Sequence, residues 1–278
     1  MSNNLNTNTN NNYNQANLVA FQTIVNKEVN RFLRIWSQTL LPSAITQSLY
    51  FLIFGGIIGS QINKIPIIDS SGAVMQVPYM QFVVPGLVMM AVLTNAFSNT
   101  VSSFFGSKFQ KNIEEMLVSP MPNSIIIAGY VIGGALRGIL VGLIVFLVAF
   151  IFGAVPAVHN YGIIALFVIM TSLVFSLAGM TNGIFAKKFD DVSIVPVFVL
   201  TPLTYLGGVF YSIQSLPPVW QTVSKFNPIV YMVDGFRYGF FGVSEVNIGI
   251  SFGILTVFMV GLIALNYNLL NRGIGMRS

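Results

Sequence analysis

Long apolar runs with almost no charge are the feature that most restricts the fold of this chain. The run from Ser124 to Phe152 carries one charged residue, Arg137, and the run from Tyr161 to Phe185 carries none. About 20 consecutive apolar residues suffice for a helix to cross the hydrocarbon core of a bilayer. A porin-like barrel would instead show alternating segments of about ten residues with a polar inner face. The sequence therefore predicts an all-α polytopic membrane protein.

The composition supports the same class. Charged residues make up 8% of the chain and apolar residues 54%, whereas a soluble domain carries about 25% charged residues. The chain has no cysteine, which excludes disulfides, a thiolate nucleophile and a cysteine metal site. The net charge is +5, and the basic residues lie beside apolar runs. This placement favours orientation in a bilayer over binding to nucleic acid.

The chain divides into three predicted segments. Residues 1–17 are rich in Asn and uncharged, so we predict a disordered tail there and not a signal peptide. Residues 18–40 contain a basic amphipathic helix with Trp36 near its end, which is typical of a helix in the headgroup plane. A soluble helix packed on a cytoplasmic partner is the alternative. Residues 41–275 form the predicted transmembrane domain. The apolar face of the amphipathic helix within residues 18–40 comprises Phe21, Ile24, Val25, Val29, Phe32, Leu33 and Trp36.

Six spans are predicted in the transmembrane domain. They are residues Leu41–Ile62, Phe82–Phe105, Ser124–Phe152, Tyr161–Phe185, Val192–Tyr211 and Val246–Leu270. The third span, at ~1.5 Å per residue, exceeds a ~30 Å hydrocarbon core and must tilt or project. Pro196 and Pro202 predict a bend in the fifth span. Residues Asn63–Tyr79, with Lys64 and Asp69, are predicted to form a polar loop.

Basic residues predict the orientation. If the N-terminus is inside, the inner segments hold Lys27, Arg31, Arg34, Lys108, Lys111, Lys187, Lys188, Arg272 and Arg277. The outer segments then hold Lys64, Lys225 and Arg237. This asymmetry satisfies the positive-inside rule and predicts that both termini are cytoplasmic.

Arg137 is the only charged residue in the predicted spans, and none of them contains Asp or Glu. Arg137 is interpreted either as snorkelling to the headgroups or pairing structurally, or as lining a path that meets an anionic substrate group. Carriers driven by protons or sodium usually need an intramembrane carboxylate. Its absence from the predicted spans argues against a secondary transporter.

Small residues form a stripe in the third span. Gly134, Gly138 and Gly142 follow one another at intervals of four, a pattern that allows close approach of helices. Packing within one chain is our default expectation, and packing between chains is the alternative.

A short amphipathic segment, Lys108–Leu117, joins the second and third spans on the predicted cytoplasmic side. It places Phe109, Ile113, Met116 and Leu117 on one face, and Lys111, Glu114 and Glu115 elsewhere. Such a helix can insert into a groove of a soluble partner. The alternative is a helix end that caps the second span.

The stretch from Tyr205 to Gly242 is too apolar for an exposed loop and too rich in Gly and Pro for one helix. We predict that it turns near Leu216-Pro217-Pro218 and continues as short helices on the outer side. Asp234 and Arg237, three residues apart, are predicted to pair across one helical turn. The alternative is that each reaches water.

No catalytic constellation or metal site is predicted. Gly106-Ser107-Lys108 lacks the upstream Gly and the strand–loop–helix context of a phosphate-binding loop. The chain is therefore not expected to bind ATP by that route.

At this point the chain resembles a family, the ABC-2 (type-2) permease subunits of ABC transporters. The resemblance covers about residues 20–278. It is carried most specifically by Leu206-Gly207-Gly208-Val209, Leu216-Pro217, Asn227-Pro228-Ile229-Val230-Tyr231 and Arg237. Segments such as FLRIWSQTLLPSAITQSLYFLIFG and SSFFGSKFQKNIEEMLVSPMP resemble members of the family as well.

The resemblance implies a function. Such permeases have six spans, an N-terminal interfacial helix, a cytoplasmic coupling helix and re-entrant outer helices between spans five and six. Two permease chains pair with two separate ATPase subunits that bind and hydrolyse ATP, so this chain itself needs no cofactor. Export of an amphiphile across the bacterial inner membrane is the expected activity. The expected coupling residues are Lys108, Phe109, Lys111, Ile113, Glu114, Glu115, Met116 and Leu117. The expected outer-gate residues are Gly207, Gly208, Pro217, Pro228, Tyr231, Asp234 and Arg237.

Two other functions remain open on the sequence. One is an ATP-independent carrier or channel, which predicts transport by this chain alone. The other is a membrane scaffold or receptor without transport, which predicts neither an ATPase partner nor efflux.

Overall fold

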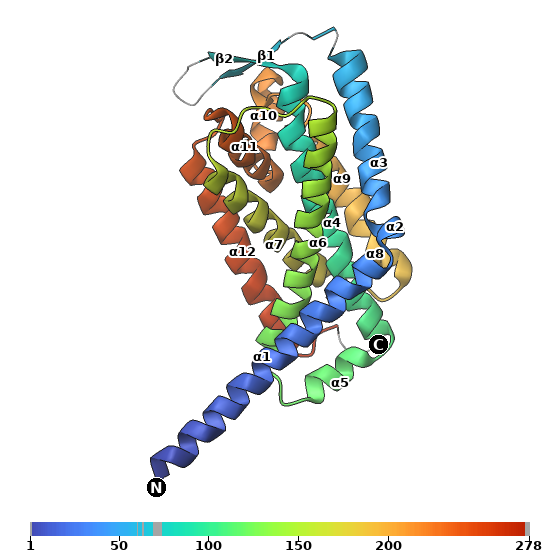
Figure 1. The fold of residues 1–278 in the computed structure, drawn as a ribbon, viewed down its shortest axis with the longest axis vertical. Coiled ribbons are helices and arrows are strands. Elements are labelled where there is room, and N and C mark those ends of the chain that lie inside the picture. Colours follow the sequence, from blue (N-terminus) through green and yellow to red (C-terminus); the bar gives the residue numbers. More distant parts are fainter. Residues whose placement is uncertain (1, 60, 63, 69–73, 276–278) are drawn as a thin grey trace.

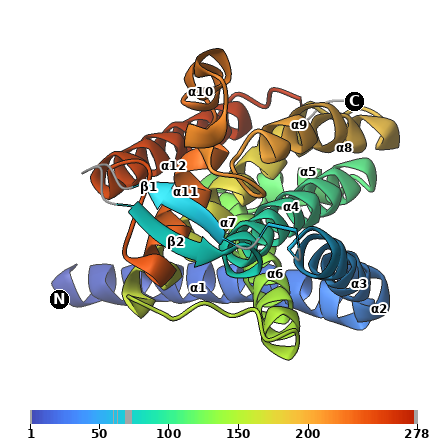
Figure 2. The same ribbon diagram turned by 90° about the horizontal axis from the view of Figure 1, so that it is seen from above.

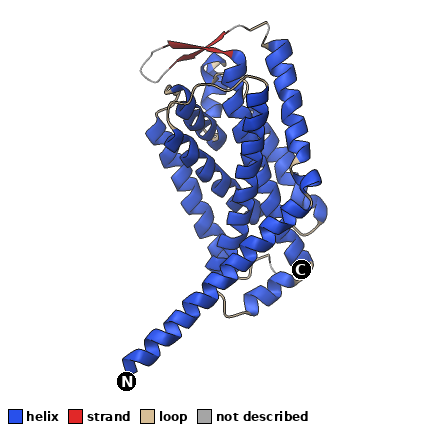
Figure 3. Ribbon diagram, viewed as in Figure 1, coloured by secondary structure: helices blue, strands red, loops and turns tan. Residues whose placement is uncertain are grey.

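Helices form almost all of the described structure. The computed structural model of the chain describes residues 2–59, 61–62, 64–68 and 74–275. The first half contains α1 (Ser2–Arg34), α2 (Trp36–Thr39), α3 (Leu41–Tyr50), η1 (Phe51–Ile58), β1 (Lys64–Ile68), β2 (Val74–Pro78), α4 (Tyr79–Phe109), α5 (Asn112–Val118) and α6 (Asn123–Ile151). The second half contains α7 (Tyr161–Phe185), α8 (Phe189–Val195), η2 (Pro196–Leu200), α9 (Thr201–Tyr205), η3 (Ile213–Ser215), α10 (Pro218–Ser224), α11 (Pro228–Phe241) and α12 (Ile248–Asn271). Figure 3 shows the two strands at one end of the helical bundle.

Helix α4 is the centre of the bundle. It packs mainly against α6 and α7, and α11 also contacts it. Seen from above, α6 and α7 lie beside α4, and α12 lies on the far side of α7 (Figure 2). In its most apolar stretch 78% of residues are buried, whereas the corresponding share for α12 is 11%. Helix α12 therefore presents most of its apolar surface outward, as a helix at the lipid boundary would.

In the described part of the chain, four helices are long and apolar enough to cross a membrane, namely α4, α6, α7 and α12. The predicted fourth span coincides with α7, and the predicted third span differs from α6 by one residue at each end. Helix α4 extends beyond the predicted second span at both ends.

The segments predicted as the first and fifth spans are helical but interrupted. Helix α3 continues as the π-helix η1, and α8 continues through the π-helix η2 into α9. In η2, the carbonyl of Pro196 accepts the backbone N–H of Thr201 and also its hydroxyl, at 2.9 Å. Pro202 follows and has no N–H to continue a regular ladder. The two prolines thus favour a wider π turn.

The prediction of a polar loop at Asn63–Tyr79 was wrong. Strands β1 and β2 pair antiparallel there, from Lys64 opposite Pro78 to Ile68 opposite Val74. The side chains of Ile67 and Val77 are buried, so this hairpin covers the end of the bundle. Asp69 lies outside the described residues, as does Arg277 at the other end of the chain.

Helix α1 packs on the bundle along part of its length. It crosses the bundle obliquely and packs on α6, and its first turns extend beyond the other helices (Figure 1). Ile24 and Phe32 are buried, whereas Leu33 and Trp36 of the same predicted face are exposed. In the structure α1 begins at Ser2, so it includes the Asn-rich segment for which the sequence predicts disorder.

The small-residue stripe on α6 faces helices of the same chain. A Cβ at Gly138 would lie 2.8 Å from the carbonyl oxygen of Val92 on α4. A Cβ at Gly142 would meet the side chain of Val92, and one at Gly134 would meet Thr100 and Ser176. Packing within the chain, our default expectation, is thus present, and α4 and α6 approach more closely than larger side chains would allow.

Candidate functional site

The segment predicted as a coupling helix is divided by a turn. Lys108 and Phe109 belong to the last turn of α4, and α5 begins at Asn112. Lys111, between them, has a φ of 63°, the only positive φ of a described residue other than Gly. Left-handed backbone at this position ends α4 and redirects the chain into α5.

One face of α5 is bound to its own bundle. Ile113 is fully buried in a cluster with Phe104 and Tyr130. The Tyr130 hydroxyl donates to the Ser107 hydroxyl at 2.7 Å and lies 4.0 Å from the sulfur of Met116. Two of the predicted partner-facing residues, Ile113 and Met116, therefore hold α5 against α4 and α6.

The opposite surface of this region is free for a partner. Phe109 is 61% exposed and Val118, at the end of α5, is 87% exposed. Glu114 and Glu115 are exposed as well. The exposed set therefore combines two large apolar side chains with two carboxylates, and it shares only Phe109 with the apolar face that helical spacing predicts.

Lys108 ties the ends of two long helices together. Its ammonium group donates to the carbonyls of Ile184 and Ala186, at 2.7 Å each. These carbonyls lie at the C-terminal end of α7, where the last helical acceptors have no partner within the helix. A displacement of α5 would therefore be transmitted both to α4 and to α7.

The short connection after α7 is held by Asp191. Its carboxylate accepts the backbone N–H groups of Lys187 and Lys188, at 2.8 and 3.0 Å. These hydrogen bonds stabilise the charged form of the carboxylate.

Arg137 lies inside the bundle and donates to acceptors of the chain itself. Its guanidinium bonds the Thr39 carbonyl at 3.2 Å, the Asn95 side-chain oxygen at 3.3 Å and the Asn99 side-chain oxygen at 3.4 Å. Of the interpretations that the sequence left open, these contacts match structural pairing.

A partly buried ion pair next to Arg137 was missed from the sequence. Glu28 of α1 is fully buried, and its carboxylate accepts Arg31 at 3.1 Å and the Ser103 hydroxyl at 2.5 Å. Arg31 also donates to the side-chain oxygen of Asn99, at 2.9 Å, which it shares with Arg137. Two guanidinium groups and one carboxylate therefore meet where α1, α4 and α6 cross. We call Glu28, Arg31, Asn99, Ser103 and Arg137 the polar cluster.

The outer stretch folds into short helices, η3, α10 and α11, at the end of the bundle that carries the hairpin (Figure 1). Pro217 and Pro228 stand at the starts of α10 and α11, where a missing N–H costs nothing. The Asn227 side chain accepts the N–H of Ile229 and donates to the Leu203 carbonyl at 2.6 Å. The hydroxyl of Tyr231 donates to the Lys225 carbonyl, also at 2.6 Å.

The prediction that Asp234 and Arg237 form an ion pair across one helical turn was wrong. Among the described residues no ion pair joins them, and neither reaches water, because both are buried. Arg237 donates to the Gly208 carbonyl at 2.8 Å and lies over the ring of Phe82, 3.9 Å from its centroid. Gly208 has a φ of 71°, which Gly adopts at little cost. Its neighbour Gly207 is packed against Ile229.

Asp234 instead holds the chain that follows α11. Its carboxylate accepts the backbone N–H groups of Glu245 and Val246, at 2.9 and 3.1 Å. The Glu245 carboxylate in turn accepts the N–H of Ile213, at 3.0 Å. Charged side chains here therefore satisfy backbone groups that no regular element satisfies, and Glu245 is a second residue that the sequence reading missed.

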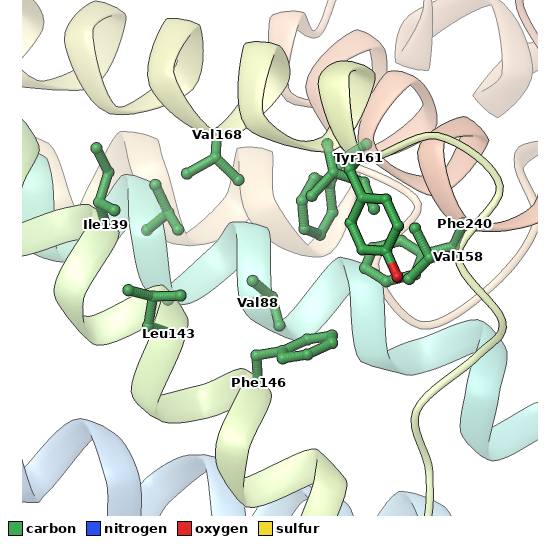
Figure 4. A pocket seen from close by; sticks show the side chains of 12 residues that line it. Val88, Ile139, Leu143, Phe146, Val158, Tyr161, Val168 and Phe240 are labelled. Atoms are coloured by element: carbon green, nitrogen blue, oxygen red, sulfur yellow. The ribbon is translucent and has the colours of Figure 1, made fainter.

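An apolar cavity of about 190 Å³ lies between α4, α6, α7 and α11. Figure 4 shows Val88, Leu143, Phe146, Tyr161 and Val168 around it. None of its described lining residues is charged. The cavity suits an apolar chain but gives no group that could orient a charged one.

Comparisons with known proteins agree on one class. A model of the family described as ABC-2 type transporter matches residues 19–241. The inner membrane transport permease YadH of Escherichia coli (strain K12) is 54% identical over 261 residues, which cover 94% of this chain and 98% of that protein. Nodulation protein J of Rhizobium leguminosarum bv. viciae is 25% identical over 208 residues, 72% of this chain and 78% of that protein.

Proposed function

Because this chain belongs to the ABC-2 type transporter family, we propose that it is the membrane-spanning permease subunit of an ABC exporter. A separate ATPase subunit binds and hydrolyses ATP, and this chain contributes the path for the substrate without catalytic residues of its own. The exposed surface of α5 is the single observation that carries the proposal, since it offers a site where such a subunit can act on the bundle.

The proposed topology has six spans. The helices α3–η1 (residues 41–58) and α8–η2–α9 (residues 189–205) serve as the first and fifth spans beside α4, α6, α7 and α12. At ~1.5 Å per residue each is about 25 Å long, close to the ~30 Å hydrocarbon core. Both expose large apolar side chains, such as Ile53 and Phe198. The helices α10 and α11 are the proposed re-entrant outer helices.

The proposed orientation places α5 and both termini in the cytoplasm. It follows from the excess of Lys and Arg in the segments on that side. The relative YadH is named an inner membrane permease, and we place this chain in the same membrane. Two copies of the chain pair in the proposed transporter, and the path lies between them.

The contacts of α5 suggest how ATP hydrolysis moves the path. Closure of the ATPase pushes on Phe109, Val118 and the two carboxylates of α5. Ile113 and Met116 pass the displacement to α6, and Lys108 passes it to α7. The outer gate at the other end of the bundle then opens. In the closed gate, Arg237 bonds the Gly208 carbonyl and Asp234 bonds the backbone that follows α11.

Glu28 is the residue to consider for the alternative function, an ion-coupled carrier. It supplies the buried carboxylate that the predicted spans lack, yet both of its oxygens already accept hydrogen bonds, from Arg31 and Ser103. A coupling carboxylate must exchange its ion during transport. The paired state therefore favours a structural role, and the driving energy comes from the ATPase.

Reconstitution in proteoliposomes tests the proposed function. The chain and the ATPase encoded beside it are expected to co-purify, and the complex should hydrolyse ATP faster than the ATPase alone, with further stimulation by the transported amphiphile in a screen. The chain alone should show no solute flux in an ion gradient. Flux through the chain alone, together with no ATPase binding, would instead establish a carrier or channel.

A further inference from the structure

A cavity of about 650 Å³ opens where α4 and α7 end, beside the turn that leads into α5. It is lined by three lysines, three phenylalanines and one glycine, namely Lys108, Lys111, Lys187, Phe105, Phe109, Phe185 and Gly275. The lining thus combines cationic and aromatic side chains from three separate parts of the chain. We call it the lysine cavity.

The lysine cavity carries positive charge without a balancing carboxylate among its described lining residues. Lys108 is held by two carbonyls, which are neutral. Within the described part of the chain, the ammonium groups of Lys111 and Lys187 make neither a hydrogen bond nor an ion pair. Asp191 is near, and one of its carboxylate oxygens accepts two backbone N–H groups, but its single negative charge does not balance the three ammonium groups of the lining. The cavity therefore attracts an anion.

The lining residues and the position of the lysine cavity indicate which class of anion it binds. Phe109 and Phe185 are more than half exposed, although each ends or nearly ends a long apolar helix. In the proposed topology, on which this inference rests, the ends of α4 and α7 lie at the level where headgroups meet acyl chains. Basic pockets between transmembrane helices on the cytoplasmic side suit anionic lipid headgroups, and exposed aromatic side chains suit the acyl region beside them.

We propose that the lysine cavity binds the phosphate of an anionic membrane lipid. The phosphate lies between Lys111 and Lys187, and the first part of an acyl chain packs on Phe185. Such a lipid joins the start of α5 to the connection after α7, and its phosphate offsets the repulsion between the lysines of these two segments. It fixes the position of α5 before any partner binds.

Binding of short-chain lipids to the purified chain, without ATPase, tests the proposal. Dioctanoyl phosphatidylglycerol and dioctanoyl phosphatidylcholine are titrated into the full chain in detergent, and bound lipid is counted by native mass spectrometry. The wild type is expected to prefer phosphatidylglycerol. Lys187→Gln should weaken that binding at least fivefold, and Lys111→Gln should weaken it as well.

Lys188→Gln is the matched control, because it removes the same charge from the adjacent residue, whose side chain does not line the cavity. It should leave the preference unchanged. Equal binding of the two lipids, or equal effects of Lys187→Gln and Lys188→Gln, would overturn the proposal. So would displacement of phosphatidylglycerol by inorganic phosphate at equal concentration, since the cavity would then be a site for free phosphate. Loss of ATPase binding in Lys187→Gln with no lipid preference in the wild type would make the cavity a docking site for the ATPase instead.

Discussion

Replacing Glu28 by Ala is expected to destabilise the bundle by about 3 kcal/mol, the typical cost of removing one partner of a buried ion pair. Glu28 is fully buried, and its loss leaves Arg31 and Arg137 sharing the Asn99 oxygen with no carboxylate between them. The Ser103 hydroxyl loses its acceptor at the same time. The midpoint of thermal unfolding in detergent measures the effect.

Two further variants separate the charge from the packing. Glu28→Gln keeps the size of the side chain and an acceptor for Ser103, so it should cost less than Glu28→Ala. Lys27→Ala changes an exposed neighbour on α1 and should leave the midpoint where it is in the wild type. If Glu28→Ala unfolded at the temperature of Lys27→Ala, the polar cluster would contribute nothing to stability and our account of α1 packing on α6 would fail.

Replacing Val118 by Asp is expected to lower the affinity for the ATPase at least about tenfold, a loss of about 1.4 kcal/mol. Val118 is 87% exposed at the end of α5, so its side chain is buried only if it makes an apolar contact with the partner. A carboxylate there would have to be desolvated in the complex. Titration of the purified ATPase against the chain in nanodiscs gives the dissociation constant.

The thermal stability of Val118→Asp should equal that of the wild type, because the side chain packs on nothing in the bundle. Val219→Asp is the matched control, since Val219 is 71% exposed on α10 at the other end of the molecule. It should bind the ATPase like the wild type. Met116→Asp would be a poor test of coupling, because Met116 packs beside Tyr130 and its replacement would disturb the fold. Unchanged affinity in Val118→Asp would remove this end of α5 from the interface.

The long helices could be predicted closely because apolar length decides them. Helix α7 lies at its predicted bounds and α6 within one residue at each end. The π-helices η1 and η2 were not predicted. Prolines indicate a bend in a helix, but they do not indicate which backbone hydrogen-bond pattern forms at the bend. The hairpin was missed because Lys64 and Asn63 made a short segment look polar, although Ile65, Ile67 and Ile68 follow at once.

The short helix between the predicted second and third spans was predictable, and its contacts were less so. Helical spacing placed Ile113 and Met116 on one face of the coupling segment, but it cannot tell whether that face meets a partner or the chain itself. For Glu28 a signal was present, since Ile24, Glu28 and Phe32 are four residues apart and share one face of α1. For Asp234 and Arg237, a spacing of three allowed a pair. The acceptors and donors they use instead come from Gly208 and from residues after α11, which the spacing does not reveal.

Site-specific cross-linking tests the central claim most directly, and the absence of cysteine from the chain makes single-cysteine variants clean probes. Glu115→Cys on α5 and Val219→Cys on α10 are each carried by the full chain, in membranes that also contain the proposed ATPase subunit. Both variants are treated with a short photoactivatable thiol reagent. Our account predicts a cross-link to the ATPase from position 115 and none from position 219. A cross-link from position 219 with none from position 115 would contradict it.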